Sequence, residues 1–287
     1  MALEFLIGVD GGGTGTRIRV ADRDGRELAR GSAGPSGLGL GIDVAWLTIR
    51  ACIARTFRES RLHFDPSTCA IGLGLAGVHN PAWAEAFLGQ ATDFHAIRLD
   101  TDGFTTLLGA HGGQAGAIVA VGTGSIGEAW LGGTERRTVS GWGFPSGDEG
   151  SGAWIGMQAA RLAQRALDGR AETTPLARAV VAQLGGDITQ AFRWLGQATQ
   201  TSYAQLTPLV LEHAANDAAA ATILRQAGEE IADIARALDS ENRLPIALCG
   251  GLAEALRPWL PSALIHRARQ PLADSATGAL HLIRGNI

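Results

Sequence analysis

The chain has 287 residues, of which 46% are hydrophobic and 18% charged, and its formal net charge is −4. This length allows two domains of ordinary size, and the composition is typical of a soluble globular protein rather than a disordered or fibrous one. Since the charge is slightly negative, we expect no nucleic-acid partner and no anionic membrane partner.

Hydrophobic runs and cysteines limit the environment of the protein. No apolar run approaches the roughly 18 residues of a spanning helix, and the N-terminus lacks a secretion-signal pattern, so we expect a cytoplasmic protein. Cys52, Cys69 and Cys249 are far apart and odd in number. They predict buried apolar residues rather than a disulfide framework or a metal cage.

All 24 basic residues are arginine, because the sequence contains no lysine. A Walker-type phosphate loop, a protein-kinase strand lysine and a Schiff base each require a lysine. The sequence therefore excludes these three mechanisms.

The first predicted elements are a buried strand at residues 5–9 (FLIGV) and an alternating strand at 16–21 (TRIRVA), joined by a glycine-rich turn. A helix, two strands and a helix follow at 44–59, 69–75, 95–99 and 103–111. A strand at 117–121 (AIVAV) then enters a second Gly/Thr/Ser turn, and residues 128–131 alternate again. This recurrence predicts two related halves.

The remainder of the chain is predicted to be mostly helical. A Gly- and Pro-rich loop, SGWGFPSGDEGSG, precedes the first of these helices. Helices are expected at residues 153–167, 176–184, 189–198 and 222–238. A strand at 245–249 ends in Gly250-Gly251, and further helices are expected from residue 252 and over 275–284.

The two glycine turns favour phosphate binding. Gly122, Gly124 and Gly127 have the spacing of a dinucleotide fingerprint, but that site needs a helix directly after the glycines and here a strand follows. Glycine-rich hairpins can instead bring backbone N–H groups close to an anion. One such turn is equally well a hairpin without a ligand, whereas two equivalent turns favour phosphate. Hydroxyls of Thr14, Thr16, Thr123 and Ser125 lie in these turns.

Several aspartates are candidate functional residues, each with a structural alternative. Asp10 can meet a phosphate-bound magnesium ion or form an Asx turn. Asp100 and Asp102 precede a helix, so either can be its N-cap or a general base. Asp148 and Glu149 lie near Trp142 in a glycine-rich loop, which suits a sugar site but also a solvated loop.

Taken together, these segments resemble the sugar kinase, heat-shock ATPase and actin superfamily. Within it they are similar to the BadF/BadG/BcrA/BcrD-type ATPases, in the branch of N-acetylglucosamine kinase and bacterial glucosamine kinase. GVDGGGTGTRIRV and AVGTGSIGEAW resemble the two phosphate motifs of that branch, and LCGGLAEAL its adenosine motif. LDTDGFTTLLGAH and GWGFPSGDEGSGAWIG resemble its catalytic and sugar-loop segments.

The resemblance implies an α/β, two-domain actin-like ATPase (ribonuclease H-like) fold with an interdomain cleft. It implies an N-terminal domain at residues 1–115, onto which a helix at about 273–287 packs, and a C-terminal domain at 116–272 with nucleotide and sugar loops. The implied enzyme is a hexosamine kinase that uses ATP and Mg²⁺ and phosphorylates glucosamine or N-acetylglucosamine, at the 6-hydroxyl. A homodimer and a small amino sugar are the implied partners.

The resemblance also implies roles for individual residues. Asp102 matches the catalytic base and contacts the sugar, and Asp10 matches the metal-associated acid. The positions that match nucleotide contacts are Gly11, Gly12, Gly13, Thr14, Gly122, Thr123, Gly124, Gly250, Gly251 and Ala253. Those that match sugar contacts are Ser36, Gly37, Ser125, Ile126, Gly141, Trp142, Gly143 and Asp148.

The sequence leaves alternatives open. Gly37 stands where amino-sugar kinases of this branch often have asparagine, so glucosamine, N-acetylglucosamine and N-acetylmuramate all remain candidate substrates. An ATPase that activates a radical dehydratase belongs to the same family, but it needs clustered cysteines for an iron–sulfur centre. A sugar-responsive regulator with an inactive kinase site is the third alternative.

Overall fold

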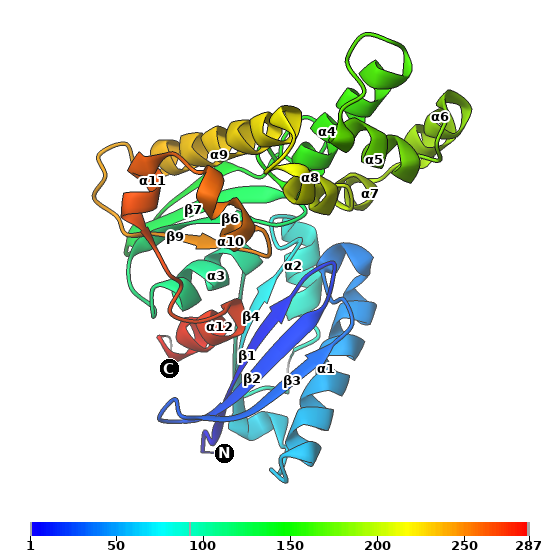
Figure 1. Ribbon diagram of the computed structural model, residues 1–287. Helices are drawn as coiled ribbons and strands as arrows, with labels where there is room; N and C mark the ends of the chain where they lie inside the picture. Colours follow the sequence, from blue (N-terminus) through cyan, green and yellow to red (C-terminus); the bar gives the residue numbers. More distant parts are fainter. Residues whose placement is uncertain (1, 92, 286–287) are drawn as a thin grey trace. The chain divides into compact units, whose positions relative to one another are not determined.

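The computed structural model describes residues 2–91 and 93–285 and divides into two compact units, Met1–Gly116 with Gln270–Ile287 (unit 1) and Ala117–Arg269 (unit 2) (Figure 1). Each unit has a five-stranded sheet with helices packed on it. The predicted α/β class is confirmed. Among the described residues, no helix combines the length and the hydrophobicity that crossing a bilayer requires.

The sheet of unit 1 has the strand order β3-β2-β1-β4-β5. Its strands are β1 (Phe5–Gly11), β2 (Thr16–Asp22), β3 (Glu27–Ala33), β4 (Cys69–Leu75) and β5 (Ala96–Asp100). The first three strands pair antiparallel, whereas β1, β4 and β5 pair parallel. The carboxyl ends of β1, β4 and β5 therefore share one edge, where open α/β sheets commonly bind ligands.

Helices cover both faces of this sheet. They are α1 (Ile42–Glu59), α2 (Pro81–Leu88), α3 (Asp102–Ala110) and α12 (Ser275–Arg284), with short 3-10 turns η1 (Leu38–Leu40) and η2 (Pro66–Thr68). Trp46, Ile49, Ile53 and Phe57 form the buried stripe of α1, which joins the core of one face. α12 packs against β1, β4 and α3 on the other face, although it comes from the end of the chain (Figure 1).

Glycines allow α12 to approach the sheet at backbone distance. A Cβ at Gly8 would lie 2.1 Å from the carbonyl oxygen of Ala276, and one at Gly72 would lie 2.0 Å from that of Ala279. No side-chain rotation relieves such a contact, because both partners are backbone atoms. The packing of α12 therefore depends on glycine at these two strand positions.

The sheet of unit 2 has the order β10-β9-β6-β7-β8, which is the order of unit 1 when the strands are matched in chain sequence. Its strands are β6 (Gly116–Val121), β7 (Ser125–Gly132), β8 (Glu135–Ser140), β9 (Ile246–Cys249) and β10 (Ala268–Arg269). In both units a glycine turn joins the first two matched strands. The predicted recurrence of two related halves is confirmed.

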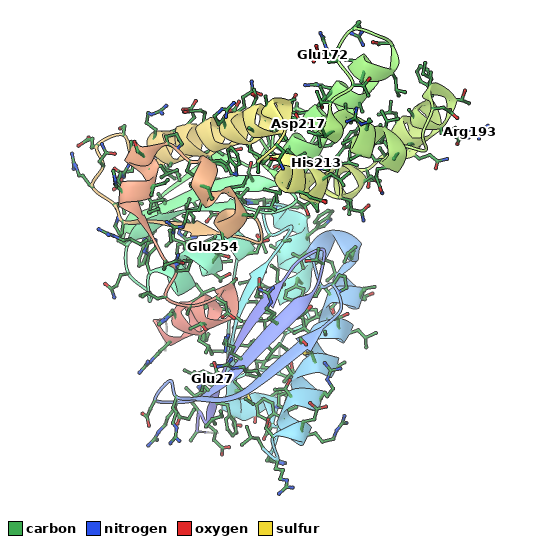
Figure 2. The ribbon with its side chains drawn as sticks, viewed as in Figure 1. Glu27, Glu172, Arg193, His213, Asp217 and Glu254 are labelled. Carbon is green, nitrogen blue, oxygen red and sulfur yellow. The ribbon has the colours of Figure 1, made fainter. Side chains whose placement is uncertain are left out.

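Most helices of unit 2 share one apolar core with its sheet. The helices described in this unit are α4 (Gly152–Leu167), α5 (Pro175–Gln183), α6 (Ile188–Gln197), α7 (Gln200–Ala204), α8 (Thr207–His213), α9 (Ala218–Leu238), α10 (Ala253–Leu256), the 3-10 turn η3 (Arg257–Trp259) and α11 (Ser262–Arg267). Asp217 caps α9 and also accepts a hydrogen bond from the backbone N–H of Leu176 at 2.8 Å (Figure 2). This buried carboxylate ties the start of α5 to the start of α9.

Among helices and strands, the predicted elements did not include β3, β8, β10, α2, α7, α8 and α11. The missed strands lie at sheet edges; β3 and β8 do not alternate as a strand with one buried face does, and β10 has only two residues. The missed helices have only five to eight residues, which is too short for a clear helical period. Tertiary pairing and packing, rather than local pattern, therefore decide these segments.

A partly buried ion pair joins α12 to β2. Arg19 donates from Nε and Nη2 to the two carboxylate oxygens of Asp274, at 2.9 and 2.6 Å, and from Nη1 to Glu27 of β3. Asp274 is also the N-cap of α12. The hydrogen bonds from Arg19 and Thr277 outweigh the cost of burial and lower the pKa of Asp274 from 3.8 to about 2.

We predict that Asp274→Asn destabilises the protein by about 1–2 kcal/mol at pH 7, after discounting for the partial exposure of this pair. The folded pKa lies below the unfolded one, so the stabilisation is present above pH 3.8 and is lost as the pH falls towards 2. Urea unfolding at pH 7 and pH 3 should show the difference shrinking. Asp168→Asn, which breaks an exposed pair with Arg170, is the control and should change little. Equal stability of wild type and Asp274→Asn at pH 7 would contradict the prediction.

Candidate active site

Asp10 lies next to the end of β1, beside the first glycine turn. Its carboxylate is 3.6 Å from Nη1 of Arg17, which is opposite it on β2 and largely exposed. Burial raises the pKa of Asp10, and the nearby charges of Asp102 and Asp274 act in the same direction. Arg17 and a hydrogen bond with Ser275 oppose that rise. The site therefore holds a carboxylate whose charge is only partly compensated.

Asp102 is the first residue of α3, directly after the parallel strand β5. The N-cap of α3 is Thr101, whose hydroxyl accepts from the N–H of Phe104 at 3.0 Å. The alternative in which Asp100 or Asp102 caps this helix is therefore wrong. Asp102 accepts from the N–H of Gly103 at 3.0 Å, and burial raises its pKa despite this bond.

One cavity of about 440 Å³ in unit 1 brings the two aspartates together. It is lined by Asp10, Gly12, Gly13, Thr14, Gly15, Thr16, Arg17, Ser32, Ala33 and Asp102. The aspartates are far apart in the sequence, and they meet because β1 and β5 end at the same edge of the sheet. A carboxylate pair thus lies beside a turn rich in backbone N–H groups.

The loop that contains Ser36 and Gly37 is hydrogen-bonded to the first glycine turn. The N–H groups of both residues donate to the carbonyl oxygen of Gly12 at 3.1 Å. Ser36 is fully buried, and its Oγ accepts from Thr16 Oγ1 at 2.6 Å. A Cβ at Gly37 would have its nearest neighbour at 3.4 Å, in Gly12, so the backbone leaves room for a side chain there.

At four glycine positions in the turns, neither the packing nor the backbone conformation of the described residues requires glycine. A Cβ at Gly12, Gly13, Gly122 or Gly251 would meet no described atom within 4 Å. None of the four has the left-handed φ that favours glycine. Gly11 differs, because a Cβ there would lie 2.2 Å from Ser36 Oγ. Open space over a glycine backbone is what close approach of a ligand requires.

In unit 2, the second turn lies beside the predicted adenosine turn and beside the start of α4, which belongs to the predicted sugar-loop segment. Gly152, at the start of α4, donates its N–H to the carbonyl oxygen of Gly122 at 2.8 Å, and Ala153 donates to that of Thr123 at 3.1 Å. Leu252 donates to the carbonyl oxygen of Val121 at 3.0 Å. The turn at residues 122–124, the start of α4 and residues 250–253 therefore form one cluster.

Gly250 has a clear backbone reason to be glycine. Its φ is 91°, and a Cβ there would lie 2.3 Å from the carbonyl oxygen of Val121. Any other residue would meet both a strained backbone and a backbone clash. Gly250 thus lets the end of β9 pass close to the end of β6.

The predicted sugar positions of unit 2 gather around the segment that follows β8, which we call the sugar loop (residues 140–150). The N–H of Ser125 donates to Asp148 Oδ1 at 3.3 Å, and its hydroxyl donates to the carbonyl oxygen of Glu149 at 2.7 Å. Ile126 pairs with Ser140 and lies beneath Gly141, where a Cβ would be 2.9 Å from its Cδ1. Trp142, between Gly141 and Gly143, is 86% exposed.

Sequence reasoning missed two polar residues that contact these groups, Ser275 and Gln200. Ser275 hydrogen-bonds Asp10 and lies 2.8 Å from Thr105 Oγ1. Gln200 donates to Asp148 at 2.7 Å. Each comes from a helix whose local sequence carries no motif, so only the tertiary structure could reveal it.

The cysteines are buried and free, as the sequence predicted. Burial raises the pKa of Cys69 to about 11 and that of Cys249 to about 12, which keeps both thiols protonated. Over residues 2–91 and 93–285, no group of three or more His, Cys, Asp or Glu side chains is suited to a metal ion.

Comparisons with known proteins agree with this organisation. The sequence model of the BadF/BadG/BcrA/BcrD ATPase family matches residues 7–282. The glucosamine kinase GspK of Vibrio cholerae is 32% identical over 97% of this chain and 95% of its own. The N-acetyl-D-glucosamine kinase of Dictyostelium discoideum is 30% identical over 88% and 87%. A solved structure from Chromobacterium violaceum, provisionally assigned as an N-acetylglucosamine kinase, has 53% identity, a TM-score of 0.93, and coverage of 98% and 99%.

Proposed function

Because the chain belongs to the BadF/BadG/BcrA/BcrD ATPase family, we propose that it is an ATP-dependent hexosamine kinase that phosphorylates glucosamine or N-acetylglucosamine at the 6-hydroxyl. The observation that carries the proposal is the unit 1 cavity, which joins Asp10, Asp102 and the first glycine turn. Phosphoryl transfer needs a group that orients the nucleophile and donors that stabilise the phosphates, and this cavity supplies both kinds.

Asp102 is the proposed general base. It accepts the proton of the sugar hydroxyl while the hydroxyl oxygen bonds to the γ-phosphorus of ATP and the bond to the ADP oxygen breaks. Its raised pKa brings it closer to neutral pH, which makes it a stronger base than an ordinary aspartate.

Asp10 is the proposed ligand of Mg²⁺. A partly buried carboxylate whose pKa is raised by burial suits a cation, and Mg²⁺ needs only one or two carboxylates when phosphates and water complete its shell. When bound, this ion would supply positive charge that offsets the charge of the transferring phosphate. Since the chain has no lysine, the remaining stabilisation comes from backbone N–H groups, hydroxyls and arginine.

The turns and loops of the two units receive the remaining roles. N–H groups of Gly13, Thr14, Thr123 and Gly124 bind phosphate oxygens, whereas those of Gly12 and Gly122 donate to the carbonyl oxygens of Gly15 and Gly124 and close the turns. Residues 250–253 bind the adenosine. The exposed indole of Trp142 and the carboxylate of Asp148 contact the sugar ring and its hydroxyls. We also propose a cytoplasmic homodimer, which sedimentation velocity would test.

The function is tested by coupled ADP release with glucosamine, N-acetylglucosamine, N-acetylmuramate and glucose as acceptors. We expect glucosamine or N-acetylglucosamine to give the highest kcat/KM, with the product phosphorylated at C6 in phosphorus and proton NMR spectra. Absence of acceptor-stimulated ADP release with every sugar would overturn the kinase proposal. Phosphate on another oxygen would overturn only the assigned position.

A further inference from the structure

The Asp148 carboxylate is held in an uncommon conformation. The residue is 5% exposed, and its φ of 60° lies in the left-handed region, which is uncommon for a non-glycine residue although aspartate tolerates it. The bond from Ser125 to Oδ1 is long, at 3.3 Å, whereas Gln200 Nε2 donates to Oδ2 at 2.7 Å. The shorter bond, from Gln200, therefore fixes this carboxylate more firmly.

Gln200 has a well-defined place because α7 is anchored at its start. Thr199 and Ser202 form a capping box, in which the Thr199 N–H donates to Ser202 Oγ at 3.1 Å and the Ser202 N–H donates to Thr199 Oγ1 at 3.2 Å. α7 also packs directly on α4 (Figure 1), since a Cβ at Gly156 would lie 1.8 Å from the carbonyl oxygen of Tyr203. The first residue of α7 thus projects from a rigid support.

A second contact links α7 to the sugar loop. The rings of Tyr203 and Phe144 lie 5.2 Å apart, within the range of a favourable aromatic pair. α7 therefore holds the sugar loop at two points, one apolar and one polar. Of these two, only the bond from Gln200 reaches a group that can bind a ligand.

The other side of the carboxylate lies against the second glycine turn. A Cβ at Gly124 would be 2.9 Å from Asp148 Oδ2 and 3.0 Å from Oδ1. An ionised carboxylate has about four acceptor positions, and hydrogen bonds from Ser125, Gln200 and the backbone N–H of Phe144 use three of them. The position that remains can accept from a hydroxyl of a bound molecule.

We propose that Gln200 is a positioning residue of the sugar site, which holds the Asp148 carboxylate against the second glycine turn so that its remaining acceptor position receives a hydrogen bond from a hydroxyl of the acceptor sugar. This inference rests on the proposed kinase function. Gln200 belongs to α7, whose sequence carries no recognisable motif. If Gln200 has this role, α7 directly affects the affinity for the acceptor sugar.

Glutamine suits this role better than its near isosteres. Its amide donates to the carboxylate without adding charge, and its hydrogen bond, like that of Ser125, opposes the rise in the Asp148 pKa that burial and Glu149 cause. Methionine fills the same volume but donates nothing. Glutamate would place a second carboxylate against Asp148, and the two could then coexist only by sharing a proton.

The test compares Gln200→Met and Gln200→Glu with the wild-type enzyme. We expect Gln200→Met to raise the KM for the amino sugar about tenfold or more, because a hydrogen bond to a charged group is lost. The KM for ATP should stay within about twofold, because Gln200 contacts no predicted nucleotide residue. Gln200→Glu should bind sugar more weakly at pH 8 than at pH 6, relative to wild type. Gln205→Met, an exposed change just after α7, is the control and should leave both KM values unchanged.

The outcomes separate this inference from the proposed function. If the wild type phosphorylates an amino sugar and Gln200→Met leaves the sugar KM unchanged, the positioning role is overturned and the kinase function stands. An equal rise in both KM values would indicate a general structural effect and would also overturn it. If Gln200→Met does not fold, the pH dependence of Gln200→Glu decides, and a profile parallel to that of wild type overturns the role. A wild type without kinase activity removes both proposals.

Discussion

Replacing Asp102 with asparagine should lower the turnover number with amino sugar by about 10²–10⁴-fold, the range for loss of a general base. Asparagine keeps the acceptor oxygen that bonds the Gly103 N–H, but it cannot take the proton of the sugar hydroxyl. The KM for sugar should therefore stay within a few-fold of the wild-type value. Steady-state kinetics with coupled ADP detection measures both quantities.

The same variant should be at least as stable as the wild type. The pKa of Asp102 is raised in the folded protein, so its ionised form weakens folding at pH values above that pKa. Neutral asparagine removes this cost at pH 7. The midpoint temperature of thermal unfolding should thus be unchanged or higher, although turnover is lost. A misfolded variant would not combine these two results.

Asp100→Asn is the matched control. Asp100 lies two residues earlier and accepts from the Thr101 N–H at 2.8 Å, and it does not line the cavity that contains Asp10 and Asp102. We expect this variant to retain its turnover. Near-normal activity of Asp102→Asn, or a large loss in Asp100→Asn alone, would show that the base has been assigned to the wrong residue.

Replacing Gly72 with alanine should destabilise unit 1 by about 3 kcal/mol, the upper part of the usual range for overpacking. The new methyl group would lie 2.0 Å from the carbonyl oxygen of Ala279 and 3.0 Å from its carbonyl carbon. Because these are backbone atoms of α12, the helix must move away from the sheet. Its displacement would also disturb Ser275 and, through it, Asp10.

Gly34→Ala provides the control in the same unit. A Cβ at Gly34 meets nothing within 4 Å, and the backbone there is not left-handed, so we expect unchanged stability. Chemical denaturation followed by circular dichroism measures both variants. If Gly72→Ala unfolds at the same denaturant concentration as Gly34→Ala, the close packing of α12 on β4 is not a significant source of stability.

The sequence predicts the sheets largely because their central strands have clear local patterns. The apolar runs at residues 5–9, 69–75 and 117–121 are strands in the structure, and the turns at residues 11–15 and 122–124 join neighbouring strands as expected. Buried strands and glycine turns are specified by residues close together in the chain. The edge strands β3 and β8 depend on their partners, so their own sequences say less.

The candidate site divides in the same way. The residues alone marked Asp10, the pair Asp100 and Asp102, and the glycine turns as candidates, because each belongs to a short motif, and the resemblance to the family favoured Asp102 as the base. The sequence left open whether Asp100 or Asp102 caps the helix. The geometry of α3 shows that the hydroxyl of Thr101 is the cap. The sequence also gave no sign of Gln200 or Ser275, whose partners lie far away in the chain.

Thus the sequence by itself determined the fold class, the duplicated strand plan and the residue types available for phosphate chemistry, including the absence of lysine. Only the tertiary structure decided which carboxylates share a cavity, which glycines face open space and which face the backbone of a helix. The physical reason is that periodicity and turn chemistry act over a few residues. Burial, desolvation and long-range hydrogen bonds act between segments that only folding brings together.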